Sequence, residues 1–225
     1  MSRQDDLIRS IEFDYPEHIP TNVYMLPATW AKYRGALEAV VRDHPVLFPD
    51  FKPWDYGNIT GTYDCGEHVD AWGCVWTNIN RGCEAIVKKH PVPTRADVHR
   101  LKPPAENTGF RHGFMYLRLC DLRGFEELMI DFAEEPPELQ MLIDIVLAYN
   151  LRQLDELMKN PLPKIVGFGD DLGMQTSLPI SPEKWRKYLK PCFARIFGPI
   201  RKAGSYVSLH SDGHIIEIIP DLIDC

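Results

Sequence analysis

The sequence has no apolar run that approaches the roughly 18 residues needed to span a membrane. Its N-terminal stretch, MSRQDDLIRSIEFDYPEH, is charged and lacks the apolar centre of a signal peptide. The chain has only six cysteines in 225 residues and no CxxC pair, too few for a disulfide scaffold. These absences predict a cytoplasmic protein with no membrane partner.

The chain also has fewer basic residues than acidic ones. The chain carries 25 Lys and Arg against 32 Asp and Glu, which gives a formal charge of −7. A dedicated nucleic-acid binder needs a basic patch to gain from counterion release, so we expect no nucleic-acid partner. Cys65, Cys74 and Cys83 fall nine residues apart, but neighbouring thiols at this odd spacing would face opposite sides of a strand. We therefore interpret them as small buried residues rather than metal ligands.

The first half of the chain mixes a helix with short extended runs. Residues 18–26 resemble a strand, and 28–43 have the apolar stripe of a helix. Over 46–93, Gly, Asn and Asp punctuate aromatic and β-branched runs, a pattern typical of antiparallel hairpins. We interpret this β-rich insertion as a layer that plugs one end of a barrel. The alternative is a lid or docking surface, because aromatic residues are common in binding hot spots: Trp54, Tyr56, Tyr63, Trp72 and Trp76.

The second half alternates strands and helices. We predict a strand at 114–119, then two helices, the second over about 137–159. A buried strand at 164–170 follows, and a further strand is expected at 205–210.

A long helix is expected between the last two strands. Ser181 is a good N-cap, and Pro182 and Glu183 suit the first turn of a helix that continues to about Ala203. Pro191 lies inside it and should kink or split it. A last helix is expected over 214–223.

This alternation indicates parallel β/α architecture. An open sheet needs only the four parallel strands expected here, whereas a closed (β/α)8 barrel of the TIM type needs eight. The chain ends on an apolar helix without a polar tail, so we expect a single barrel domain over 1–225 that is truncated at its C-terminus. A barrel cut open exposes strand edges and an apolar face, so such a chain should self-associate.

Two strand ends are rich in polar residues, which is where parallel β/α folds place functional groups. Asp170 and Asp171 follow the strand at 164–170, and Gln175 comes shortly after. The next strand leads into His210 and Asp212. Loop turns and helix caps would also account for these residues, but both clusters sit at the same end of consecutive strands. We therefore predict that Asp170 or Asp171 meets His210 and Asp212 in one pocket.

The chemistry of these groups permits two roles. His210 and Asp212 offer an imidazole nitrogen and a carboxylate oxygen, both competent zinc ligands. The same groups can act as acid and base without a metal. His214 follows a Ser-Asp-Gly turn, so we place it at the pocket rim. Carboxylates crowded together repel one another, so we expect either a bound metal or a raised carboxylate pKa.

Residues 121–224 resemble the uroporphyrinogen decarboxylase superfamily, which also contains cobalamin-dependent methyltransferases. DLRGFEELMIDFAEEPPEL is similar to that family's helix pair. GFGDDLGMQTSLPISPEKWRKYLKPCFARIFGPIRKAG is similar to its central strand, loop and long helix, and SYVSLHSDGHIIEIIPDLI to the next strand and turn. VDAWGCVWTN at 69–78 is similar to a stretch of the methyltransferase-like branches.

The resemblance implies a (β/α)8 barrel, of which this chain is similar to the N-terminal two-thirds. The methyltransferases bind zinc through His-x-Cys at the strand end that matches His210, and through a cysteine far downstream. Here Asp212 stands in place of the first cysteine, and a carboxylate is a harder donor than a thiolate. The decarboxylases open with an Arg-Gln-Ala-Gly-Arg-Tyr stretch, which residues 1–40 do not contain; Arg34-Gly35 lacks its context.

The resemblance therefore predicts corrinoid-linked methyl transfer, with zinc and with a corrinoid carried by a partner protein. The first alternative is decarboxylation of uroporphyrinogen or another polycarboxylate. The second is a non-catalytic protein that binds a tetrapyrrole or a partner; a homodimer is compatible with each of these. The expected site residues are the catalytic Asp170, Asp171 and His210, the substrate-binding Gln175, Asp212 and His214, and the metal ligands His210 and Asp212.

Overall fold

The computed structural model describes residues 3–225. These residues form two compact units. The first contains residues up to His68 together with Thr77–Ile86, and the second contains Val69–Trp76 together with Val87–Cys225. Within the described chain, no helix combines the length and the apolar character needed to cross a bilayer.

The first unit holds two helices, α1 (Arg3–Ile11) and α2 (Pro27–Asp43). The helix expected over 28–43 is therefore confirmed, although Arg34 interrupts it with φ 44° and ψ −122°. Trp30 on α2 is buried because its ring stacks between Phe51 and Tyr56, at centroid distances of 5.5 and 5.3 Å.

The strand expected at 18–26 is wrong. The structure has no strand over these residues. Ile19 and Tyr24 are 86 % and 74 % exposed. The alternating apolar residues that suggested a strand have no neighbouring strand to pair with and no apolar layer to bury them.

Three short strands, β1 (Gly66–Val69), β2 (Val75–Asn78) and β3 (Ile86–Lys89), form a sheet in the order β1-β2-β3. They lie within the 46–93 region, for which hairpins were expected. Residues 46–65 form no strand and contain only a 3-10 helix, Gly61–Tyr63. Whether this region plugs a barrel or acts as a lid stays a prediction.

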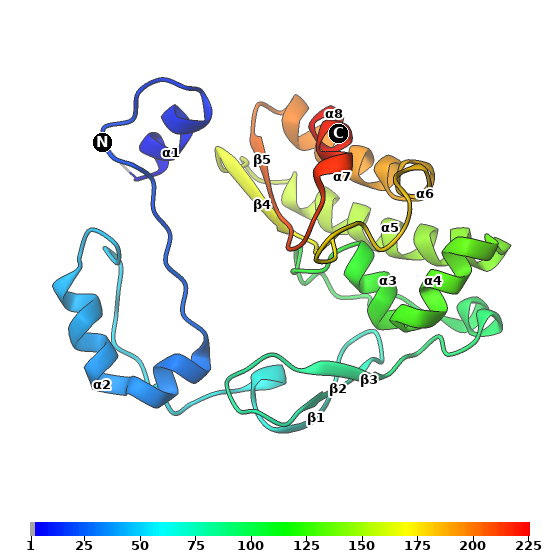
Figure 1. Cartoon of the computed structure of the whole chain (residues 1–225), viewed down its shortest axis with the longest axis horizontal. Coiled ribbons are helices and arrows are strands. Elements are labelled where there is room, and N and C mark those ends of the chain that lie inside the picture. Colours follow the sequence, from blue (N-terminus) through cyan, green and yellow to red (C-terminus); the bar gives the residue numbers. More distant parts are fainter. Residues whose placement is uncertain (1–2) are drawn as a thin grey trace. The chain divides into compact units, whose positions relative to one another are not determined.

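The second unit contains two parallel strands, β4 (Ile165–Gly169) and β5 (Tyr206–His210). Their register runs from Ile165 opposite Tyr206 to Gly169 opposite His210, and the strands lie side by side in Figure 1. The helices around them are α3 (Tyr116–Arg123), α4 (Phe125–Glu134), α5 (Pro137–Leu157), α6 (Pro182–Tyr188), α7 (Lys190–Lys202) and α8 (Ile219–Asp224), with 3-10 helices at Arg95–Arg100 and Ile216–Ile218.

The strand expected at 114–119 is also wrong, because these residues open helix α3. Nearly every side chain in this run is buried, so the apolar pattern does not distinguish a buried strand from a buried helix. A distant residue decides the outcome: the carboxylate of Asp170 accepts hydrogen bonds from the backbone N–H groups of Tyr116 and Leu117. Those N–H groups lack partners inside the helix, so their capture favours the helical conformation.

The long helix between the last two strands is divided, as expected. Ser181 accepts a hydrogen bond from the backbone N–H of Lys184 and starts α6. Leu189 separates α6 from α7, and Pro191 lies in the first turn of α7. Proline lacks an N–H and fits there without the loss of a helical hydrogen bond.

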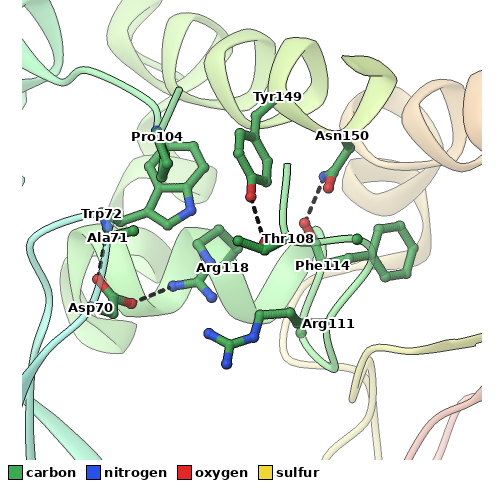
Figure 2. A pocket seen from close by; sticks show the side chains of 12 residues that line it. Asp70, Ala71, Trp72, Pro104, Thr108, Arg111, Phe114, Arg118, Tyr149 and Asn150 are labelled. Carbon is green, nitrogen blue, oxygen red and sulfur yellow. Dashed lines mark hydrogen bonds and ion pairs between the residues drawn. The ribbon is translucent and has the colours of Figure 1, made fainter. Parts of the chain in front are cut away.

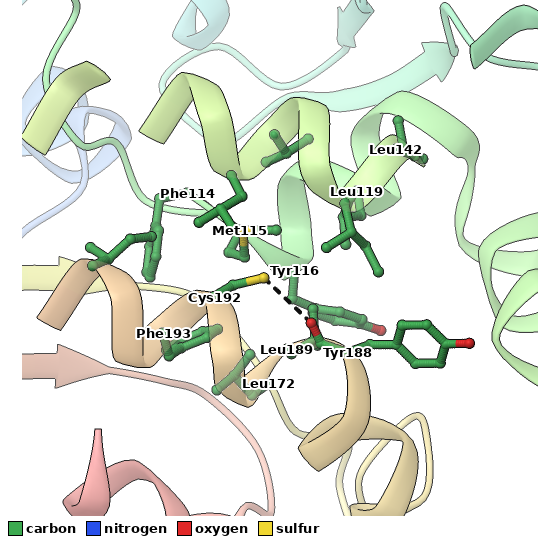
Figure 3. Packing of buried hydrophobic residues seen from close by; sticks show 14 of the residues in the cluster. Phe114, Met115, Tyr116, Leu119, Leu142, Leu172, Tyr188, Leu189, Cys192 and Phe193 are labelled. Atoms are coloured by element: carbon green, nitrogen blue, oxygen red, sulfur yellow. Dashed lines mark hydrogen bonds between the residues drawn. The ribbon is translucent and has the colours of Figure 1, made fainter. Parts of the chain in front are cut away.

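The core of the second unit is formed by side chains from α3, α5 and α7 and from the loops next to β4 (Figure 3). Phe193 of α7 is at its centre. Its ring contacts Phe114, Trp185 and Phe197 at centroid distances of 5.2, 5.8 and 5.4 Å. Phe168 of β4 contacts Phe197 at 4.9 Å, so the same aromatic cluster holds the sheet against α7.

The structure is thus a mixed α/β fold. Among residues 3–225 the parallel sheet consists of β4 and β5, joined through α6 and α7. A complete barrel is not seen in this part of the chain, so the (β/α)8 architecture stays a prediction.

Replacing Phe193 by alanine should lower the free energy of unfolding by about 3–5 kcal/mol, because loss of the fully buried ring leaves a cavity beside Phe114 and Trp185. The measurement is urea unfolding followed by circular dichroism. Arg195→Ala, an exposed position of the same helix, is the control and should change the value by less than about 0.5 kcal/mol. Equal effects of the two variants would contradict this packing.

Candidate metal and catalytic site

The ends of β4 and β5 bring two loops to the same edge of the sheet. Gly169 pairs with His210 in the last position of the register. The backbone N–H of Asp170 then donates to the carbonyl of His210 at 3.0 Å, which extends the pairing by one residue. Side chains after this point must lie next to one another, as the sequence predicted.

Asp171 lies at the centre of a polar cluster at this edge. Its Oδ1 accepts a hydrogen bond from the backbone N–H of Asp212 at 2.9 Å and lies 3.7 Å from Nε2 of His210. Nε2 of His210 is also 3.4 Å from Oδ1 of Asp212. Three of the expected residues, Asp171, His210 and Asp212, are therefore brought together by the structure.

His112 is a fourth member, which the sequence did not predict. Its Nε2 is 3.1 Å from Oδ2 of Asp171, and its ring centroid is 5.6 Å from that of His210. The ring approaches β4 closely because Gly169 has no side chain: a Cβ there would lie 2.3 Å from Nδ1 of His112. The backbone N–H of Gly113 donates to the carbonyl of Gly169 at 2.7 Å and fixes the loop.

Two glycines set the distance between the loops that carry Asp171 and Asp212. A Cβ on Gly173 would lie 2.5 Å from the backbone nitrogen of His214, and a Cβ on Gly213 would lie 2.3 Å from the carbonyl of Gly173. Gly213 also has φ +84°, a conformation that favours glycine. The two loops therefore cross backbone to backbone.

Asp170 does not belong to the cluster. Its side chain is fully buried, and Oδ2 and Oδ1 accept hydrogen bonds from the N–H groups of Tyr116 and Leu117 at 2.6 and 2.9 Å. Burial raises the pKa of this carboxyl to about 7, although the backbone hydrogen bonds oppose the rise. The raised carboxylate pKa expected at this edge is therefore present, but its cause is burial rather than crowding with other carboxylates. The structure gives Asp170 the position of a helix-capping residue.

Gln175 and His214 lie near the cluster in sequence but do not bond to its side chains. Gln175 is exposed. The backbone N–H of His214 donates to the carbonyl of Met174 at 2.7 Å, whereas its ring forms no hydrogen bond or ion pair within residues 3–225. Their expected roles in substrate binding stay predictions.

The donor set of the cluster suits a divalent metal. His112, Asp171 and His210 can each offer one ligand atom, and these atoms lie within 4.8 Å of one another. Ligand atoms around a tetrahedral zinc are about 3.3 Å apart, so small side-chain rotations would bring the three ligand atoms to this spacing. Two imidazoles with one carboxylate is an established zinc combination, and Asp212 can add a fourth ligand because it already contacts His210.

The cluster is accessible from solvent. The side chains of His112 and His210 are 51 % and 61 % exposed, and that of Asp171 is 27 % exposed. A metal ion or a small molecule can therefore reach the histidine rings from solvent without any movement of the core.

Comparison with solved structures finds a protein of similar fold. The chain is similar to a methyltransferase from Methanosarcina mazei, with a TM-score of 0.62 and 16 % sequence identity. The similarity covers 100 % of this chain and 74 % of that one. No family model and no curated protein matches the sequence.

The buried carboxyl of Asp170 should make stability depend on pH. Its pKa is about 7 in the folded protein, against 3.8 for an unperturbed aspartate. Between these pH values the folded state keeps a proton that the unfolded state has lost, so stability falls as pH rises, by up to about 1.4 kcal/mol per pH unit. Asp170→Asn removes this titration.

The measurement is urea unfolding of the wild-type protein and of Asp170→Asn between pH 4 and 8. Relative to Asp170→Asn, the free energy of unfolding of the wild type should fall as the pH rises to about 7, and the difference should then level off. Parallel curves over the whole range would show that Asp170 does not retain its proton on folding.

Proposed function

We propose that this protein is a metal-dependent methyltransferase of the uroporphyrinogen decarboxylase superfamily, which moves a methyl group from a corrinoid to a thiol. The observation that carries the proposal is the meeting of His112, Asp171, His210 and Asp212 at the end of β4 and β5. The methyltransferase-like fold supports the same reaction class, and the sequence motifs around Asp171 and His210 support the superfamily.

His112, Asp171 and His210 would hold the metal, with Asp212 beside them. Zinc bound there would lower the pKa of an acceptor thiol and so make it nucleophilic at neutral pH. Asp171 has a second role, because its Oδ1 bonds to the backbone N–H of Asp212 while Oδ2 bonds to His112. It therefore keeps the loops on both sides of β4 in a fixed spacing.

The corrinoid would be carried by a partner protein. The exposure of His112 and His210 is consistent with a methyl donor that is presented from outside.

The cluster favours methyl transfer over the two alternatives. Decarboxylation of a polycarboxylate requires basic groups around the substrate, whereas this cluster holds the carboxylates of Asp171 and Asp212. A purely structural role would require all the polar groups to be committed to internal bonds. That is true of Asp170, but His112 and His210 keep exposed rings.

Zinc binding should depend on both histidines. We expect His112→Ala and His210→Ala each to lower zinc affinity by about 10–100-fold or more, measured by isothermal titration of the metal-free protein. His214→Ala is the matched control in the same loop and should bind zinc like the wild type. Because His210 is exposed, its replacement should leave the thermal midpoint within a few degrees.

Gly169→Ala offers a second test that keeps all ligands. The added Cβ would displace the His112 ring, so zinc affinity should fall although every ligating side chain is still present. Unchanged affinity in Gly169→Ala and in both histidine variants would contradict the metal site.

Methyl transfer itself can be followed with methylcobalamin and a panel of small thiols, since demethylation changes the corrinoid spectrum. The zinc-loaded protein should accelerate the reaction with at least one thiol, and His210→Ala should abolish the acceleration. Zinc binding without any acceleration across the panel would support the metal site but contradict the proposed methyltransferase activity.

A further inference from the structure

A second site lies in the same unit, on the other side of the loop that carries His112. It is a pocket with a free volume of about 40 Å³, formed by the segment around Trp72, the 104–114 loop, α3 and α5 (Figure 2). Arg111 and Gly113, the two neighbours of His112, both line it. No part of the proposed methyl transfer uses this pocket.

Arg118 is fixed at the wall of this pocket. Its side chain is 10 % exposed, and its Nη1 contacts Oδ2 of Asp70 at 3.0 Å and Oδ2 of Asp121 at 3.4 Å. Its guanidinium also lies 6.0 Å from the centre of the Trp72 ring. Nη1 makes the hydrogen bond to Asp70, and within residues 3–225 neither Nε nor Nη2 donates a hydrogen bond to the protein.

The carboxylate of Asp70, which lies beside Arg118, already accepts four hydrogen bonds. Oδ1 of Asp70 accepts from the backbone N–H groups of Trp72 and Cys74, both at 2.9 Å. Oδ2 accepts from Nε1 of Trp76 at 3.1 Å and from Nη1 of Arg118. A carboxylate has about four lone-pair sites, so Asp70 cannot satisfy the remaining donors of the pocket.

Two further donors face the same space, as Figure 2 shows for Arg111 and Trp72. The guanidinium of Arg111 and the indole Nε1–H of Trp72 have no hydrogen-bond partner among the described residues. The hydroxyls of Thr108 and Tyr149 are paired with each other at 2.9 Å. The pocket therefore has three groups with unsatisfied donors, two of them arginines, whereas the one carboxylate in its lining, that of Asp70, is fully committed.

We propose that this pocket binds the carboxylate group of a ligand. Guanidinium groups bind carboxylates through paired N–H donors, and the indole N–H adds a donor from the side. One water needs about 10–15 Å³ of such volume, so 40 Å³ leaves room for a small planar group such as a carboxylate. The rest of the ligand would extend out of the pocket past Arg111.

The pocket is separate from the metal site. Arg111 and His112 are neighbours in one loop, yet Arg111 lines the pocket and His112 contacts Asp171. A ligand held by its carboxylate would therefore lie near the metal cluster, but its binding needs no metal.

The test is a titration of the full chain with acetate, followed by the NMR signals of the Gly109 and Gly113 amides, which line the pocket. We expect saturable shifts at millimolar acetate. Arg111→Gln should weaken binding about tenfold or more, and Trp72→Phe, which removes the N–H and keeps a ring, about threefold to tenfold. Arg195→Gln, an exposed arginine on α7, should bind acetate like the wild type.

Three comparisons decide the outcome. Acetamide, which is neutral, and sulfate, which is larger, should both bind at least tenfold more weakly than acetate. His112→Ala should keep acetate binding while it loses zinc, so failure of the metal site and failure of this pocket can be told apart. Absence of saturable shifts, equal binding of sulfate, or an unaffected Arg111→Gln variant would overturn the proposal.

Discussion

The site depends on one buried interaction, the capture of two N–H groups at the start of α3 by the carboxylate of Asp170. This interaction joins the end of β4 to a helix about fifty residues earlier in the chain. It also decides the direction of the next side chain. Successive residues of an extended chain point to opposite sides, so with Asp170 held inward, Asp171 is directed outward to the histidines.

A charged group buried in this way is costly unless it is protonated or well bonded. Burial raises the pKa of Asp170, while the helix N-terminus stabilises its charged form. The arrangement of the site therefore depends on the Asp170 carboxyl group, whose burial is itself energetically costly.

The sequence was sufficient to predict the features that depend on local signals. β4 and β5, their shared edge, and the meeting of Asp171 with His210 and Asp212 follow from strand-helix alternation and from polar residues at strand ends. The break between α6 and α7 follows from Pro191. Each of these signals lies within a few residues of the feature that it predicts.

What could not be predicted depends on distant contacts. The run at 114–119 leads into a helix because Asp170, far away in the sequence, caps the helix start. No pattern within the run indicates these hydrogen bonds to Asp170. His112 reaches Asp171 across 59 positions of sequence, and only the missing side chain of Gly169 admits its ring. The opposite error occurred at 18–26, where a strand-like pattern has no partner strand.

The crossing of Gly173 and Gly213 also bears on how such a site can diversify. At this crossing the two loops approach each other through main-chain atoms. The side chains of Ser211 and Asp171 also join them, by accepting hydrogen bonds from the backbone N–H groups of Leu172 and Asp212, so the spacing does not depend on the side chains of the residues that follow. The exposed positions that follow, Met174 and Gln175, can therefore change freely in evolution or in a mutant library. The side chains around the cluster can change there while the arrangement of Asp171 and His210 is kept.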